Sequence, residues 1–259
     1  MPKLAQSLAD KRFVVTVELD PPRGVDIAAL TELARGLASR VDAVVLSDNR
    51  GACPRQSPCW AAHRLGAAGV EVIMTLTCRD RNRLGLTSEM LGAAAAGVEN
   101  LLLVSGDFVS LGDHPGAKPV HDLDSVQALQ LAALLAQGRD LSGTELAGVP
   151  TFLLGASTHP QANPLAPQVM KLRKKVLAGA AFLISEPLAS TQALIGLREH
   201  AGDLGVPLLA GVELSDPAGR EQAVHLAREI KSGGLAAGVH LSAPASPDLL
   251  PDLLEACGL

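Results

Sequence analysis

The chain has 259 residues, of which 47% are hydrophobic and 19% charged, so it can bury a large core and lacks the composition of a disordered protein. Its formal net charge of −5 argues against a nucleic-acid-binding surface, because phosphate groups are bound by basic patches. No apolar run approaches the roughly 20 residues of a membrane helix, and the first residues, MPKLAQSLADKR, lack the apolar core of a secretion signal. We therefore expect a cytoplasmic protein, and the sequence leaves open whether it forms homo- or hetero-oligomers.

Eight short hydrophobic runs recur along the chain, separated mostly by helical segments. Each run is nearly continuous in hydrophobicity rather than alternating, as in parallel strands that are covered by helices. The runs span residues 13–19, 43–46, 70–76, 100–105, 151–156, 181–185, 207–212 and 237–241. No G-x-G-x-x-G phosphate turn follows the first run, which argues against a doubly wound sheet. We therefore predict an α/β protein with one (β/α)8 TIM barrel that spans residues 1–259 as a single domain.

The most informative stretch is residues 74–120. It contains a strand, a polar cluster (Thr77 to Arg83), a small-residue helix from about residue 88 to 96, a second strand and a polar loop that begins at Gly106-Asp107. In parallel barrels the loops that follow the strands form the active-site face. Long loops follow the fourth and fifth predicted strands, and long loops in compact domains are usually functional.

Two acidic residues stand at predicted strand ends. Glu18 lies near the end of the first strand, where apolar walls would raise the pKa of a carboxyl toward the range of a general acid. Asp107 follows the fourth strand, and the preceding glycine permits close approach of a ligand to the backbone. The residues alone favour a solvated Glu18 paired with an arginine, and they also fit an Asp107 that caps its own turn.

Two further polar segments have ordinary structural explanations. Asp124 and Ser125 open a helix, and Asp124 fits an N-cap. Lys171, Arg173, Lys174 and Lys175 fit a solvated helix face.

Cysteines and aromatic residues restrict the cofactors that the chain could bind. The spacings of Cys53, Cys59, Cys78 and Cys257 match no zinc or redox motif, so we predict free thiols and no metal site. The chain has four phenylalanines, one tryptophan and no tyrosine, which leaves little aromatic surface to stack on a flavin or pterin.

An ordered set of motifs resembles the methylenetetrahydrofolate reductase family, in particular a bacterial branch with CRDRN and GD-x-P-x-A loops. The matching segments cover nearly the whole chain: FVVTVELDPPRG, TCRDRNRLGL, AAGVENLLLVSGD, GDHPGA, HDLDSVQAL, LRKKVLAGAAFLISEP, VPLLAGV and GVHLSAP. Each motif alone is weak, whereas the set in this order is specific. The resemblance implies flavin-dependent reduction of 5,10-methylenetetrahydrofolate to 5-methyltetrahydrofolate, with FAD as cofactor. The electron donor would be NAD(P)H or a partner subunit.

The resemblance also implies roles for individual residues. Glu18, in an E-x-x-P-P segment, matches the proton donor, and Asp107 matches an aspartate that contacts folate and influences the flavin. His159, Lys174 and Lys175 match residues at the flavin diphosphate. The remaining expected cofactor contacts are Ser47, Thr75, Ser105, Gly106, Asp107, Asp124 and Ser125.

The chain departs from the family at three places. Thr75 stands where the family has the histidine of H-x-T-C. Glu186 replaces a strand-six glutamine that bonds nicotinamide and pterin, and an ionised glutamate accepts hydrogen bonds without donating any. The connection from 213 to 238 is short, where the family usually has additional helical structure next to the substrate. We count Glu186 as a third catalytic candidate.

Two other functions fit the same residues. The first is a non-catalytic or partner-dependent barrel that binds a pterin or nucleotide within a one-carbon or corrinoid methyl-transfer complex. The departures and the scarcity of aromatic residues favour it, whereas Glu18, Asp107 and the lysines oppose it. The second is a pterin-dependent methyltransferase barrel without flavin.

Overall fold

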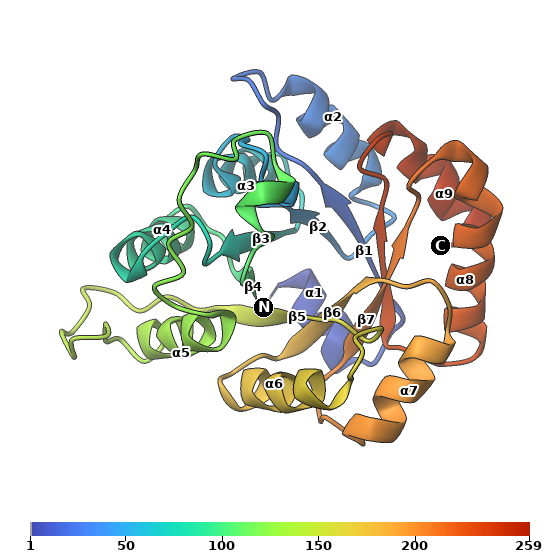
Figure 1. Cartoon of the computed structure of the whole chain (residues 1–259). Coiled ribbons are helices and arrows are strands. Elements are labelled where there is room, and N and C mark those ends of the chain that lie inside the picture. Colours follow the sequence, from blue (N-terminus) through green and yellow to red (C-terminus); the bar gives the residue numbers. More distant parts are fainter. Residues whose placement is uncertain (1) are drawn as a thin grey trace.

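The computed structural model describes residues 2–259, and within them eight parallel strands close into a barrel in sequential order (Figure 1). The strands are β1 (Val14–Leu19), β2 (Ala43–Leu46), β3 (Val72–Thr77), β4 (Asn100–Val104), β5 (Leu153–Thr158), β6 (Phe182–Pro187), β7 (Leu208–Glu213) and β8 (Gly238–Ser242). β1 pairs with β8 as well as with β2, which closes the barrel. The (β/α)8 prediction is therefore confirmed.

Helices surround the barrel and bury its outer face. They are α2 (Ala28–Leu37), α3 (Pro58–Ala67), α4 (Arg83–Ala95), α5 (Ser125–Leu135), α6 (Ala166–Leu177), α7 (Gln192–Ala201), α8 (Arg220–Ser232) and α9 (Leu250–Cys257). Apolar side chains of the helices and of the outward strand positions form one large core. Among residues 2–259, every helix is too short or too polar to cross a membrane.

A second, smaller apolar cluster fills the interior of the barrel. It contains Val14, Val45, Ile73, Leu102 and other inward residues of the strands, together with Leu4 of α1 (Lys3–Ala9). Leu4 is completely buried, so α1 closes the end of the barrel at which the strands begin. Because side chains alternate along a strand, the inward positions further along each strand lie above this floor and face the opposite end.

The connections differ in length as the sequence indicates. The loop after β4 contains a 3-10 turn, Val109–Leu111, before α5 begins. The connection from β7 to β8 contains the short turn Pro217–Gly219 and α8. The helix after β3 begins at Arg83, five residues before the predicted start, because the side chain of Asn82 caps it by accepting from Gly85 N at 3.0 Å.

Candidate active site

A polar cavity of about 320 Å³ opens at the carboxyl ends of the strands, the face on which TIM barrels carry their active sites. Nine of the predicted site residues line it: Glu18, Ser47, Thr75, Ser105, Gly106, Asp107, His159, Lys175 and Glu186. Three other predicted residues, Lys174, Asp124 and Ser125, lie outside the cavity lining. The strand ends therefore bring most of the predicted residues together.

Glu18 lies on β1 with 19% of its side chain exposed. Its carboxylate is 3.3 Å from Nη1 of Arg50 and 3.5 Å from Nε2 of His240. Burial raises the pKa of Glu18, but the hydrogen bond from His240 and the charge of Arg50 outweigh this effect, so the pKa is lowered overall. The expectation that apolar walls raise this pKa is therefore wrong, because two basic side chains face the carboxylate.

Arg50 is a site residue that the motifs do not indicate. It lies in the 3-10 turn Arg50–Ala52, in which Gly51 and Ala52 have positive φ angles of 61° and 57°, as does the preceding residue Asn49 at 50°. This compact turn directs the guanidinium toward the barrel axis, where it pairs with Glu18 and, at 2.5 Å, with Glu213 of β7. Arg50 thus connects the turn after β2 to β1 and to β7, the two strands that flank β8.

His240 is a second such residue. It lies at an inward position of β8, is 7% exposed, and lines the cavity. The strand register sets Thr16 opposite His240, and Thr16 Oγ1 is 3.0 Å from His240 Nδ1. A histidine within an otherwise apolar strand could have drawn attention, but its partners on β1 lie more than 220 positions away in sequence.

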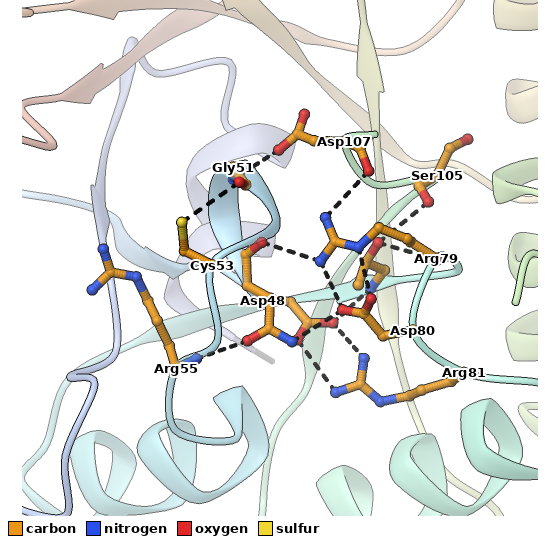
Figure 2. Close-up of polar contacts among 11 residues, drawn as sticks. Asp48, Gly51, Cys53, Arg55, Arg79, Asp80, Arg81, Ser105 and Asp107 are labelled. Atoms are coloured by element: carbon orange, nitrogen blue, oxygen red, sulfur yellow. Dashed lines mark hydrogen bonds and ion pairs between the residues drawn. The ribbon is translucent and has the colours of Figure 1, made fainter. Parts of the chain in front are cut away.

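The CRDRN segment organises the loops beneath Asp107 (Figure 2). The side chain of Arg79, 2% exposed, binds Asp80 and donates to the backbone oxygens of Asn49 and Asp107. Arg81 pairs at 2.6 Å with Asp48, whose side chain is fully buried. These contacts link the loops after β2, β3 and β4, so the motif is a structural clamp for the mouth.

Asp107 is fixed by the neighbouring loop. Its Oδ2 accepts from Gly51 N at 2.8 Å, so it caps the turn that carries Arg50 rather than its own turn. Gly106 has φ +92°, and a Cβ there would lie 2.1 Å from Thr77 Oγ1. A glycine is therefore required before Asp107, for its backbone conformation and for the close approach to β3.

Basic residues of α6 face the other side of the cavity. Lys175 is 6% exposed and donates to the carbonyl of Ser157 at 2.5 Å. Burial, assisted by the charge of Lys171, lowers the pKa of Lys175 to about 8. Lys171 also lines the cavity, whereas Lys174 is exposed outside it. The two lysines that line the cavity are therefore Lys175 and Lys171, and Lys174 is not one of them.

Asp124 and Ser125 have the structural role that their sequence position suggests. Asp124 caps α5 and forms a capping box with Gln127. Ser125 is buried, and its hydroxyl lies 3.3 Å from that of Ser105. Ser105 thus connects this helix end to the cavity.

Glu186 and Thr75, two of the three departures from the family pattern, both line the cavity. Thr75 is buried at an inward position of β3. Burial raises the pKa of Glu186, and the charges of Asp107 and Glu18 raise it further against the opposing effect of His159. The pKa values of Glu18 and Glu186 are therefore displaced in opposite directions within one cavity.

The fold and the cavity define a TIM-barrel protein with a polar site of acids, lysines and two histidines at its carboxyl-terminal mouth. The sequence pattern described as methylenetetrahydrofolate reductase matches residues 3–216, so the chain belongs to the methylenetetrahydrofolate reductase family. A probable methylenetetrahydrofolate reductase (NADPH) of Caenorhabditis elegans is 23% identical over 224 residues. That match covers 81% of this chain and 32% of the nematode protein, so the chain spans about a third of this relative.

Solved structures with the same fold are more distant in sequence. A Clostridium thermocellum protein that binds two copies of 5-methyl-5,6,7,8-tetrahydrofolic acid superimposes with a TM-score of 0.63 at 12% identity, covering 98% of this chain and 97% of that one. Tryptophan synthase of Mycobacterium tuberculosis superimposes with a TM-score of 0.58 at 14% identity, covering 99% and 95%. At these identities the similarity establishes the barrel fold.

Proposed function

We propose that this chain catalyses the flavin-dependent reduction of 5,10-methylenetetrahydrofolate to 5-methyltetrahydrofolate. The observation that carries the proposal is Glu18, a carboxylate with a histidine neighbour at the floor of a polar barrel mouth, in a member of the reductase family. The folate bound by the Clostridium thermocellum barrel supports a folate-type substrate for this fold. The electron donor would be NAD(P)H or a partner protein.

The donor groups of the cavity fit a flavin dinucleotide. Lys175 and Lys171 supply positive charge for a diphosphate, and within residues 2–259 the carbonyl of Ser157 occupies one of the three N–H donors of Lys175. Ser105, Gly106 and Thr75 supply small polar surfaces for the ring. Among the described residues the lining includes no phenylalanine, tyrosine or tryptophan, so the ring would be held by hydrogen bonds and aliphatic contacts. A bound reduced flavin would supply the hydride.

The chain's own residues would position the substrate and move a proton. Glu18 would protonate the leaving nitrogen of the substrate's five-membered ring, so that the ring opens to the electrophilic iminium. A positioned acid contributes roughly 10²–10⁴-fold to a rate. Asp107, fixed by Gly51 N, would orient the pterin, and Glu186 would act in place of the family's glutamine.

The experiment separates the two half-reactions. Reduction of protein-bound FAD and formation of 5-methyltetrahydrofolate are measured in the wild type, in Glu18→Gln and in the control Glu221→Gln, at an exposed position of α8. We expect Glu18→Gln to reduce flavin normally and to lose product formation by roughly 10²-fold or more. Equal slowing of both half-reactions would show that Glu18 is structural or a flavin contact.

The alternative is a barrel that binds a pterin or nucleotide without catalysis. The ion pair of Glu18 with Arg50 favours it, because a carboxylate kept ionised in this way is not a ready proton donor. Folate binding without turnover, with every tested electron donor, would support this function instead.

A further inference from the structure

The environment of Glu18 presents a chemical difficulty for an acid. The carboxylate is flanked by Arg50 and His240, and both lower its pKa against the effect of burial. Two other carboxylates are near: Glu213 of β7 shares Arg50, and Glu186 of β6 interacts through its charge. A group in these surroundings is ionised near neutral pH, so it needs a proton from a neighbour before it can act as an acid.

His240 is placed to supply that proton. Its Nδ1 lies 3.0 Å from Thr16 Oγ1, and the Thr16 hydroxyl also donates to the carbonyl of Val239 at 3.5 Å. When Nδ1 carries a hydrogen, it can donate to the Thr16 hydroxyl, which in turn can donate to this carbonyl, and Nε2 then faces Glu18. The second ring nitrogen, Nε2, lies 3.5 Å from the Glu18 carboxylate, close enough for a proton to pass between the two groups.

The surroundings restrict the ring to this role. His240 is 7% exposed, and its register with β1 is set by paired backbone strands rather than by a loop. Rigid positioning of this kind keeps the two groups within reach of each other during a reaction. Arg50, by contrast, is a permanent cation and cannot release a proton under these conditions.

We propose that His240 is a positioning residue that shares a proton with Glu18 and reprotonates it. The Nε2 proton of the His240 imidazolium moves to the Glu18 carboxylate, and the carboxyl group formed in this way gives its proton to the substrate nitrogen, which leaves Glu18 ionised again. The imidazole is left neutral with its hydrogen on Nδ1, bonded to Thr16, and it regains a proton from water at the open mouth. In this role the proposal rests on the reductase function, whereas the proton sharing itself is a property of the protein alone.

The first test needs no activity. The Glu18 carboxyl is followed by ¹³C NMR through a pH titration in the wild type, in His240→Gln and in His225→Gln, a control on the exposed side of α8. The resonance is assigned by its loss in Glu18→Gln. We expect the pKa of Glu18 to rise in His240→Gln and to stay unchanged in His225→Gln. An unchanged pKa in His240→Gln would overturn the proposal.

The second test is the pH dependence of single-turnover product formation. Without its proton donor, Glu18 must be protonated by solvent, so His240→Gln should lose roughly 10²-fold in rate at neutral pH and recover steadily as the pH falls. A loss by the same factor at every pH would indicate a purely structural histidine and would overturn the relay. If the wild type itself forms no product, the reductase function fails, and the NMR titration alone decides whether the pair shares a proton.

Discussion

At the scale of single residues, two carboxylates of one cavity have pKa values displaced in opposite directions. The pKa of Glu18 is lowered because the effects of His240 and Arg50 outweigh that of burial. The pKa of Glu186 is raised by burial and by the charge of Asp107. Opposed environments of this kind allow one site to contain a group that cycles a proton and another that stays protonated. A protonated Glu186 would donate a hydrogen bond, as the family's glutamine does.

Glu186 leads to a prediction about pH. Because the folded-state pKa is raised, the protonated donor is present below that pKa and is lost as the pH rises through it. Product formation should therefore fall on the alkaline side in the wild type. Glu186→Gln keeps a donor at every pH, so its profile should be flatter there, with equal or better use of NAD(P)H.

A steady-state pH profile of the two proteins checks this prediction. If Glu186→Gln is inactive at all pH values, the carboxylate has a charge-dependent function of its own, such as binding a cationic group. The assignment of Glu186 as a substitute for glutamine would then be abandoned.

Glu18 and Asp107 could be selected from sequence because they match motifs of the family and stand at strand ends, which face one mouth in a parallel barrel. The direction in which the pKa of Glu18 is shifted could not be predicted, since it depends on His240 on β8 and on Arg50 in a turn with positive φ angles. Neither partner is near Glu18 in the chain. Lys174 and Lys175 are adjacent, and their opposite exposure depends on the rotation of α6 against the barrel.

At the scale of elements, hydrophobic runs located each strand to within about two residues, because buried parallel strands are apolar on both faces. The start of α4 is harder to predict from the sequence. Its N-cap, Asn82, lies within a cluster of charged residues that is typical of a loop. The clamp that this cluster forms depends on contacts with the loops after β2 and β4, which local sequence does not specify.

The clamp leads to a prediction about stability. Arg81→Met leaves the fully buried Asp48 without its partner, and breaking such a pair typically costs about 3–5 kcal/mol. Burial already raises the pKa of Asp48 despite Arg81. Ionisation of a carboxylate with a raised pKa favours the unfolded chain. The loss of unfolding free energy in Arg81→Met should therefore be larger at pH 8 than at pH 5.

Urea unfolding at the two pH values measures this difference. The control is Arg83→Met, which removes an exposed pair with Asp122 and should leave the midpoint nearly unchanged. The double variant Arg81→Met/Asp48→Asn should regain part of the loss, because no buried charge is left unpaired. Equal effects of Arg81→Met and Arg83→Met would show that the clamp is unimportant for stability.

At the scale of the whole molecule, the cavity is lined by residues from every part of the closed barrel, from β1 to β8. A ligand there contacts segments that come together only in the folded chain. Binding to the native state alone stabilises a protein by about 2.7 kcal/mol at a ligand concentration of 100 times Kd. For a protein of this size, that corresponds to a rise in Tm of roughly 5–10 °C.

We therefore expect FAD to raise the Tm of the purified protein and to have its fluorescence quenched on binding. Because the pKa of Lys175 is lowered to about 8, the affinity for FAD should depend on pH. The ammonium is charged below that pH, so affinity for the diphosphate should weaken as the pH rises above about 8. Lys175→Met should bind FAD weakly at all pH values, whereas Lys174→Met, at an exposed position on the same helix, should bind like the wild type.

The free ligand 5-methyltetrahydrofolate distinguishes the two functions in the same assay. A protein that is colourless, takes up no added FAD and yet is stabilised by the folate would lack the flavin chemistry of the reductase. The barrel would then be a folate-binding subunit, and the lysines would serve another anion. Stabilisation by FAD that is equal in the wild type and in Lys175→Met would instead place the diphosphate elsewhere in the mouth, because the buried ammonium would then contribute nothing to binding.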